Sequence, residues 1–310
     1  MSAVERTIVP SERRLTVSHD TALIVEGGAM RSVFSAGLLD GFLQEDFDPF
    51  DFYIGVSAGA SNLAAFLAGT PLKTLDVYLN FALSKRFIDY GRFLRGGHLI
   101  DIDWLVATAI SQGAFDVTAP FSRGKRLYVG LTDLASGEGY YVKVGPYNLS
   151  GVIKASMALP VFYRGFPEVD GRPMTDGGVA DGIPVGLAIR LGAKRIMVVR
   201  SRASSYRKRD SWVHRYVRWK MRGHAALLAS MRERVERHEA VVDLIRHPPP
   251  GVSIVEVSPP EDFVLGRFSR DRAALLQGYQ TGFEAAQDAM FRWRDSERSL
   301  SNPWGEGRNP

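Results

Sequence analysis

The sequence contains no cysteine. This absence excludes disulfide bonds, a thiolate nucleophile and a cysteine-ligated zinc site, and it fits a reducing compartment such as the cytoplasm. No uninterrupted apolar run is long enough to span a bilayer. Residues 1–15 mix charges and lack the apolar core of a secretory signal, so we expect no signal peptide. The remaining candidates for chemistry are serine, aspartate and histidine, and we expect no cofactor.

The charge surplus is modest and positive. The chain has 39 basic and 34 acidic residues among 310, a formal net charge of +5. Such a surplus favours anionic partners, either a lipid surface or nucleic acid, and says nothing about fold. No nucleic-acid recognition motif accompanies it, so we expect no nucleic-acid partner. A hydrophobic content of 45% and a charged content of 24% are ordinary for a globular protein with a full core.

The most informative stretch is a turn between an expected strand and an expected helix. Residues 50–56 are aromatic and β-branched, as in a short buried strand, and residues 60–68 are rich in alanine and leucine, as in a helix. Between them lies Gly55-x-Ser57-x-Gly59, the nucleophile-elbow pattern, which holds a serine hydroxyl out of a sheet. The pattern alone is weak because its residues are common, but the flanking strand and helix favour an active-site serine over a plain turn.

A glycine pair follows the first convincing strand, which we place at residues 21–26. Parallel strands bring their C-terminal ends to one edge of a sheet, so Gly27 and Gly28 should lie beside Ser57. Their N–H groups can then point at a developing alkoxide without obstruction by a side chain. The alternative is a phosphate loop for a nucleotide, which we disfavour because neither G-x-G-x-x-G nor G-x-x-x-x-G-K-[ST] is present there.

The best candidate for a general base is Asp176. It follows a short expected strand and precedes two glycines, so its carboxylate can lie at the end of the sheet. An Asx-type turn is the alternative that Asp-Gly-Gly also favours. A histidine base is a second alternative, because four histidines follow Asp176 in the sequence. None has a motif around it, and we expect them on the surface of the basic helical region: His214, His224, His238 and His247.

Three motifs in one order, with a fourth segment, resemble the patatin-like phospholipase family over about residues 21–200: Glu26-Gly27-Gly28-Ala29-Met30-Arg31, Gly55-Val56-Ser57-Ala58-Gly59, Asp176-Gly177-Gly178 and Ala155-Ser156-Met157-Ala158-Leu159-Pro160. The resemblance implies a three-layer α/β fold with a central, mostly parallel sheet flanked by helices. It also implies a Ser–Asp dyad, in which Ser57 attacks an ester carbonyl and Asp176 takes its proton. A carboxylate with an ordinary pKa of about 4 is a weak base for this task, so we expect desolvation to raise its basicity.

The same resemblance implies roles for the first motif. The N–H groups of Gly27, Gly28 and Ala29 would form the oxyanion hole. Ala29 stands where the family usually has a third glycine, and Ser32 where a glycine often follows the basic residue. Alanine keeps the N–H, so we expect only a modest effect unless the position needs a positive φ. Arg31 matches the family's basic position, where it would hold the loop, meet an anionic head group or form a structural ion pair.

We expect a single domain over residues 21–292, preceded by a polar leader at 1–20 and followed by a flexible tail at 293–310. The part 201–292 is basic and largely helical, and it matches no motif. Residues 86–97 are aromatic, basic and glycine-bearing, which indicates either an irregular cap near the site or an ordinary surface loop.

Residues 211–222 combine aromatic and basic side chains at helical spacing. Such a helix can rest on an anionic membrane, but the pattern also fits a helix that packs Trp212, Tyr216 and Trp219 on the core. The function favoured overall is a serine acyl hydrolase of phospholipase or esterase type. It would act on phospholipids or other acyl esters, in the cytoplasm or at the inner face of the membrane. The alternatives are a lipid- or membrane-binding protein that hydrolyses little and a Ser-His-Asp esterase.

Overall fold

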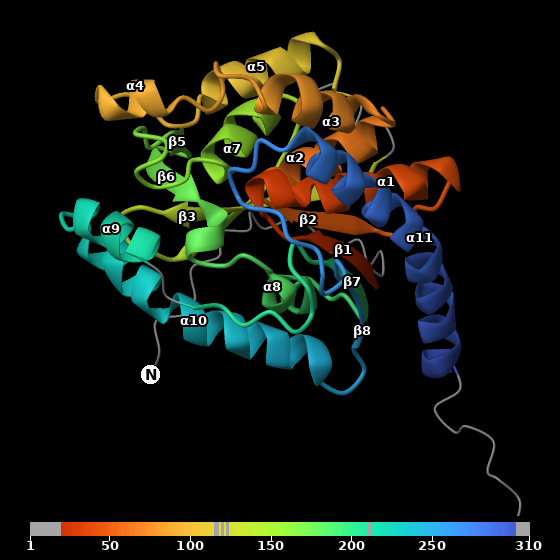
Figure 1. Cartoon of the computed structure of the whole chain (residues 1–310). Helices are drawn as coiled ribbons and strands as arrows, with labels where there is room; N and C mark the ends of the chain where they lie inside the picture. Colours follow the sequence, from red (N-terminus) through yellow and green to blue (C-terminus); the bar gives the residue numbers. More distant parts are fainter. Residues whose placement is uncertain (1–19, 115–117, 119–120, 122–123, 210–211, 302–310) are drawn as a thin grey trace, which may run out of the picture.

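The computed structural model describes residues 20–114, 118, 121, 124–209 and 212–301 (Figure 1). The leader expected at 1–20, apart from Asp20, lies outside this description, as do residues 302–310 of the expected tail. Among the described residues, no helix combines the length and the apolar character needed to cross a bilayer.

Within the described residues, a mixed sheet of eight strands forms the centre of the molecule, in the order β5-β6-β3-β2-β1-β7-β8 with β4 paired to β3. Five neighbouring strands run parallel: β3 (Arg126–Asp133), β2 (Phe52–Val56), β1 (Thr21–Val25), β7 (Arg195–Val199) and β8 (Ser253–Val257). Antiparallel strands extend the β3 side: β4 (Gly139–Lys143), β6 (Arg172–Asp176) and β5 (Glu168–Val169). The predicted, mostly parallel sheet is confirmed.

Helices cover both faces of this sheet and complete a three-layer architecture (Figure 1). Side chains alternate along each strand, so Leu23 and Val25 enter one core while Ala22 and Ile24 enter the other. The larger core lies under α1 (Val33–Gln44), α2 (Ala58–Ala68), α7 (Leu149–Ser156) and α11 (Arg272–Ser301). The smaller core lies under α8 (Val185–Arg190) and α10 (Ala225–Arg246).

Short helical elements lie over the α2 side of the molecule (Figure 1). They are α3 (Lys73–Asp76), the π-helix η2 (Val77–Ala82), α4 (Tyr90–Leu94) and α5 (Ile102–Ser111). Three further elements border the site: the 3₁₀ helices η1 (Ala29–Ser32) and η3 (Gly177–Val179), and the helix α9 (Trp212–Lys220).

The last helix, α11, packs against α1 with direct backbone contact. A Cβ at Gly37 would lie 1.9 Å from the Tyr279 carbonyl oxygen. A Cβ at Gly282 would lie 1.9 Å from the Phe34 carbonyl oxygen. Because no residue with a side chain fits at either position, these glycines set how closely the two helices approach. The contact ties the C-terminal part of the chain to the helix that follows the first motif.

The expected start of a flexible tail at residue 293 is wrong, because α11 continues to Ser301. Trp293 gives the physical reason. Its side chain is 2% exposed, and its ring lies 5.0 Å from that of Phe50 and 4.3 Å from the guanidinium carbon of Arg195. Burying so large an aromatic side chain stabilises the last turns of the helix against the sheet edge.

Candidate active site

Ser57 occupies a strained turn between β2 and α2. Its backbone has φ +53° and ψ −130°, and a positive φ is costly for a residue with a Cβ. The two glycines of the predicted elbow are required by close packing. A Cβ at Gly55 would lie 2.4 Å from Ala60 Cα. A Cβ at Gly59 would lie 2.4 Å from the Val25 carbonyl oxygen, so the turn can form only with glycine at both positions.

Asp176, at the end of β6, lies within hydrogen-bonding distance of the serine hydroxyl. Ser57 Oγ donates to Asp176 Oδ2 at 2.8 Å, and the Gly178 N–H donates to Oδ1 of the same carboxylate at 2.8 Å. Burial raises the pKa of Asp176, and these two hydrogen bonds and the charges of Arg267 and Lys208 oppose the rise. The expected desolvation is therefore present, and it makes the carboxylate a stronger acceptor for the hydroxyl proton.

Hydrogen bonds from neighbouring elements hold both side chains in place. The Ser57 N–H donates to Ser156 Oγ at 2.7 Å, and the Ser156 hydroxyl donates onward to a carbonyl oxygen of β3 at 2.7 Å. The Asp176 N–H donates to the Ala158 carbonyl oxygen at 3.0 Å. Thr132 Oγ1 donates to the Asp176 carbonyl oxygen at 2.9 Å. Ser156 and Ala158 belong to the fourth segment that resembles the family, but sequence reasoning found no role for them or for Thr132.

The Gly27–Ala29 loop lies directly beside the serine. A Cβ at Gly27 would lie 2.7 Å from Ser57 Cβ, so glycine is needed for this approach. In the described part of the chain, the N–H groups of Gly27, Gly28 and Ala29 donate to no acceptor. Ala29 has φ +51°. The position therefore needs a positive φ, the case in which alanine in place of glycine was expected to matter, because its Cβ adds backbone strain.

Arg31, on η1, is 6% exposed. A structural ion pair was one expectation for it, and the described residues offer it none; its Nε also lacks a hydrogen-bond partner among them. Burial lowers the pKa of Arg31 to about 9, and the positive charges of Arg267 and Arg202 add to this effect, while Glu26 opposes it. The side chain is therefore a buried cation whose neighbours are mainly other cations.

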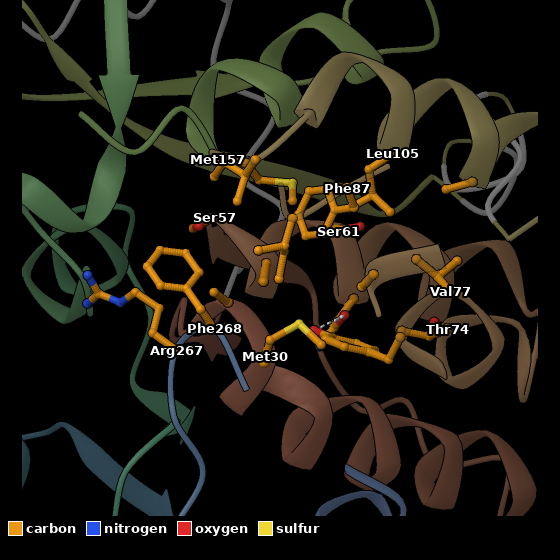
Figure 2. A pocket seen from close by; sticks show the side chains of 18 of the residues that line it. Met30, Ser57, Ser61, Thr74, Val77, Phe87, Leu105, Met157, Arg267 and Phe268 are labelled. Carbon is orange, nitrogen blue, oxygen red and sulfur yellow. Dashed lines mark hydrogen bonds between the residues drawn. The ribbon is translucent and has the colours of Figure 1, made fainter. Parts of the chain in front are cut away.

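An apolar pocket opens on one side of Ser57 (Figure 2). It is narrow, with a volume of about 70 Å³. Its walls come from α2, η2, α5 and the segment before α4, and they include Met30, Ala65, Val77, Phe87, Leu105 and Met157. Figure 2 shows the Arg267 guanidinium on the far side of the Phe268 ring from these residues. The pocket therefore suits a slender hydrocarbon and keeps charge at its entrance.

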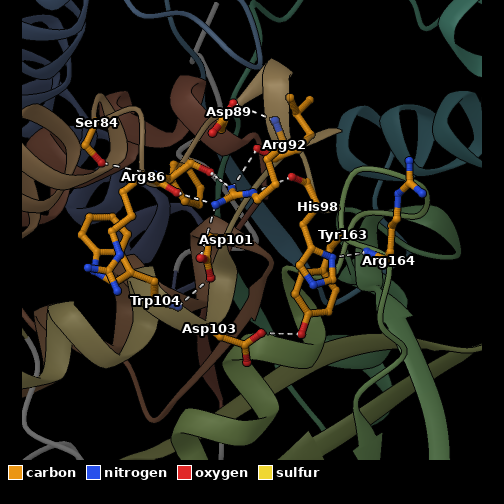
Figure 3. A network of polar contacts seen from close by, with 12 residues as sticks. Ser84, Arg86, Asp89, Arg92, His98, Asp101, Asp103, Trp104, Tyr163 and Arg164 are labelled. Carbon is orange, nitrogen blue, oxygen red and sulfur yellow. Dashed lines mark hydrogen bonds and ion pairs between the residues drawn. The ribbon is translucent and has the colours of Figure 1, made fainter. Parts of the chain in front are cut away.

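The segment 86–97 forms part of this pocket and is not a plain surface loop. Arg92 folds it into a compact cap (Figure 3). Its guanidinium donates to the carbonyl oxygens of Arg86 at 2.9 Å, Phe87 at 3.0 Å and His98 at 2.8 Å. One side chain thus closes the loop on itself. The same fold turns Phe87 and its neighbour Ile88 into the pocket wall.

Comparison with known proteins identifies the family. Residues 23–189 match the family described as patatin-like phospholipase. The chain belongs to this family of lipid acyl hydrolases. Residues 224–297 match a domain of unknown function, DUF6363.

Two individual proteins illustrate the relationship. The uncharacterized protein YjjU of Escherichia coli K12 is 35% identical over 268 residues, which cover 84% of this chain and 74% of that protein. The crystal structure of VipD from Legionella pneumophila is similar with a TM-score of 0.52 and 10% identity, covering 88% of this chain and 67% of that one. At that identity, the likeness to VipD shows the fold alone.

A second, wider pocket of about 400 Å³ opens on the other side of Ser57, and Asp176 lies in its wall. We call it the cationic pocket, because its lining includes six basic side chains against the carboxylates of Glu26 and Asp176. Most of its charged residues come from the part of this patatin-like chain that follows β7. The six are Arg31, Arg202, Lys208, Arg218, Arg234 and Arg267.

Histidines of the basic region also reach this pocket. His214 and His238 are part of its lining. The expectation that the histidines lie on the surface is wrong for His238, which is 8% exposed. Burial lowers the pKa of His238 to about 4, and the charge of Lys208 contributes. The ring is therefore neutral at pH 7, and the Ser57 hydroxyl donates its hydrogen bond to Asp176.

Helix α9 presents its tryptophans to solvent. Trp212 is 78% exposed and Trp219 55% exposed, so the interpretation that they pack on the core is wrong. Val217 and the adjoining Met221 fill that position instead, in a small cluster with Leu227 of α10. The helix therefore buries Val217 and exposes its two tryptophans, while Tyr216 and Arg218 are half-buried.

Proposed function

We propose that this patatin-like protein is a serine acyl hydrolase that cleaves the acyl ester of a lipid by a Ser57–Asp176 dyad. The observation that carries the proposal is the 2.8 Å hydrogen bond from the Ser57 hydroxyl to a buried carboxylate. The hydroxyl also lines the apolar pocket. An acyl chain in that pocket would place its ester carbonyl at the serine.

The steps follow from the positions of these groups. Ser57 Oγ attacks the ester carbonyl carbon while its proton passes to Asp176, whose raised pKa favours the transfer. The carbonyl oxygen becomes an oxyanion, which the N–H groups of Gly27, Gly28 and Ala29 would stabilise. Collapse of this intermediate expels the alcohol, which takes the proton from Asp176, and leaves an acyl-serine. Water then attacks the acyl-serine with Asp176 as base, releasing the fatty acid and restoring Ser57.

Hydrolysis of 4-nitrophenyl decanoate and labelling by a fluorophosphonate probe test this proposal together. Ser57→Ala should abolish both signals, and Asp176→Asn should lower turnover by at least about 10³-fold. His238→Ala serves as the comparison for a Ser-His-Asp esterase. If Asp176→Asn kept most of its activity and His238→Ala lost it, the dyad would be replaced by a histidine base.

Measuring Tm tests whether the activity lost in Asp176→Asn is due to unfolding. Because the folded-state pKa of Asp176 is raised above its unfolded value, ionising it costs stability as pH rises through the folded pKa. Asp176→Asn removes that cost, and its amide can still accept the hydrogen bond from the Gly178 N–H. Its Tm at pH 7 should therefore equal or exceed that of the wild type.

We also propose that α9 brings the protein to an anionic lipid surface. The exposed Trp212 and Trp219 stand beside basic side chains of the same helix, as in interfacial helices. Sedimentation with vesicles of phosphatidylglycerol tests this against vesicles of phosphatidylcholine. A Trp212→Ser, Trp219→Ser variant should lose most of the binding to anionic vesicles, and unchanged binding would contradict the proposal.

A further inference from the structure

The cationic pocket collects positive charge from four separate segments. Arg31 comes from η1, Arg202 and Lys208 from the segment after β7, and Arg267 from the loop before α11. Within the described residues, none of these four forms a salt bridge with a carboxylate. Glu26 is the nearby acid, and its carboxylate already accepts the Ser201 N–H at 2.7 Å. The pocket therefore gathers more positive charge than its own acids balance.

Such a cluster is unfavourable in an empty pocket. Burial lowers the pKa of Lys208 to about 8, and the charges of Arg234 and Arg267 add to the effect. Arg31 is affected in the same way by Arg267 and Arg202. Like charges brought together at low dielectric cost free energy, which an anion bound among them would offset. Clusters of this kind are typical of binding sites, since packing alone gains nothing from them.

The geometry relates this pocket to the scissile bond. The apolar pocket and the cationic pocket share Ala29, Ser57, Leu159, Arg267 and Phe268. An ester whose acyl chain fills the apolar pocket therefore directs its alcohol portion into the cationic pocket. The charged group of that alcohol would meet the lysine and the arginines within a few bonds of the ester.

We propose that the cationic pocket binds a terminal phosphate monoester on the alcohol portion of the substrate, so that this chain selects acyl esters of a phosphomonoester alcohol over both neutral esters and zwitterionic phosphodiester lipids. This inference rests on the proposed function. A phosphate monoester offers three acceptor oxygens and about two negative charges to several cations, which a single carboxylate does not. Guanidinium groups match its oxygens in a bidentate manner. A quaternary ammonium on the head group would add positive charge beside the cluster, so zwitterionic choline lipids should be poorer substrates.

The test compares two substrates with one acyl chain, decanoylglycerol 3-phosphate and decanoylglycerol. We expect the wild type to hydrolyse the phosphate-bearing ester with the higher kcat/KM. Lys208→Met and Arg202→Met should each lower the ratio of the two kcat/KM values by about 10- to 100-fold, the effect of losing a hydrogen bond to a charged group. The ratio is the right quantity, because Lys208 also acts on the pKa of Asp176, which affects both substrates equally.

Lys143→Met is the matched control, since Lys143 is exposed on β4 and is not part of this lining. It should leave the ratio unchanged. An unchanged ratio in both Lys208→Met and Arg202→Met, with normal turnover of the neutral ester, would overturn the inference and leave the proposed function standing. A wild type that prefers the neutral ester or the choline ester would overturn it as well.

Direct binding separates the inference from catalysis. Calorimetry on Ser57→Ala with the ether lipid 1-O-decylglycerol 3-phosphate should show binding at least about tenfold tighter than 1-O-decylglycerol. This holds even if no ester were turned over, a result that would count against the proposed function alone. Equal binding of the two ether lipids would overturn the inference. Inorganic phosphate that bound as tightly as the ether lipid would point to free phosphate and overturn the assignment to the substrate.

Discussion

The two pockets that meet at Ser57 differ in almost every physical property. The apolar pocket is narrow, and its lining residues lie between Ala29 and Leu159, apart from Arg267 and Phe268. The cationic pocket is several times larger, and most of its charged lining follows residue 200. The first lies largely within residues 23–189, which match the patatin-like family, and the second draws on the part of the chain beyond them. The family region thus supplies the serine, the aspartate and most of the hydrocarbon wall, whereas the C-terminal third supplies most of the positive charge.

The two pockets have opposite effects on the stability of the fold. Burying apolar side chains around a narrow slot stabilises the fold apart from the small void that remains. Gathering arginines and a lysine around a pocket opposes folding, because each charge is desolvated near others of the same sign. A feature that costs stability and lies at an active site is typical of a ligand site. The comparison therefore supports the proposal that the acyl chain lies on one side of the serine and an anion on the other.

Of the changes that separate the two pockets, filling the apolar pocket should have the largest effect. Ala109 of α5 lines it and is 4% exposed. Ala109→Leu should lower kcat/KM for 4-nitrophenyl decanoate by about 10- to 100-fold relative to 4-nitrophenyl butanoate, because the added methyl groups occupy the space of distal methylenes. Ala107→Leu, at an exposed position of the same helix, is the control. In the double variant Ala109→Leu, Lys208→Met, the two changes in kcat/KM should multiply. A product far from the measured value would mean that the two pockets are not independent.

A smaller effect is expected from pH. Lys208, with its pKa lowered to about 8, is protonated below that pH and loses its charge above it. The preference for decanoylglycerol 3-phosphate over decanoylglycerol should thus fall several-fold between about pH 7 and 9, after rising near pH 6 as the phosphate becomes a dianion. Lys208→Arg should flatten the fall. The charged groups that act on Lys208 are Arg234, Glu26, Arg267 and Arg237. A ratio that stayed constant over this range would show that Lys208 does not contact the phosphate.

The smallest effect is expected at a residue shared by both pockets. Ala29 has φ +51°, so Ala29→Gly removes strain of roughly 1 kcal/mol from the folded state. Glycine also raises the conformational entropy of the unfolded chain, which lowers stability by a similar amount. The free energy of unfolding should change by less than about 1 kcal/mol. Turnover of the phosphate-bearing and neutral esters should change by one common factor, since both reactions would place their oxyanion at this loop under the proposed mechanism. A change in their ratio would show that the loop itself selects the head group.

Much of the fold and the centre of the site could be predicted from local patterns. The strand at 21–25 and the elbow around Ser57 depend on short-range rules of alternation and turn geometry, and both are present. The parallel order of β1 and β2 follows from the handedness of strand–helix–strand crossovers. The pairing of Ser57 with Asp176 is 119 residues apart in sequence, and it was predictable because ordered motifs resembled a known family.

Other features could not be predicted, because they depend on which face of a helix meets the rest of the molecule. The α9 pattern fitted both orientations of Trp212 and Trp219, and packing of Val217 and Met221 against Leu227 decided between them. The burial of His238 depends on how α10 lies against the segment after β7. The last turns of α11 were expected to be a tail, since no local signal shows that Trp293 finds a hydrophobic partner in Phe50.

By itself, the sequence determined the elements, the strained serine turn and the identity of its acidic partner, because those depend on residues close together or on motifs kept in order. Only the tertiary structure decided that the serine stands between a slot for hydrocarbon and a pocket of positive charge. The physical reason is that neither pocket belongs to one segment. Each forms where side chains from distant parts of the chain converge, and Arg31, Lys208 and Arg267 become a cluster only once the sheet brings their loops to one edge.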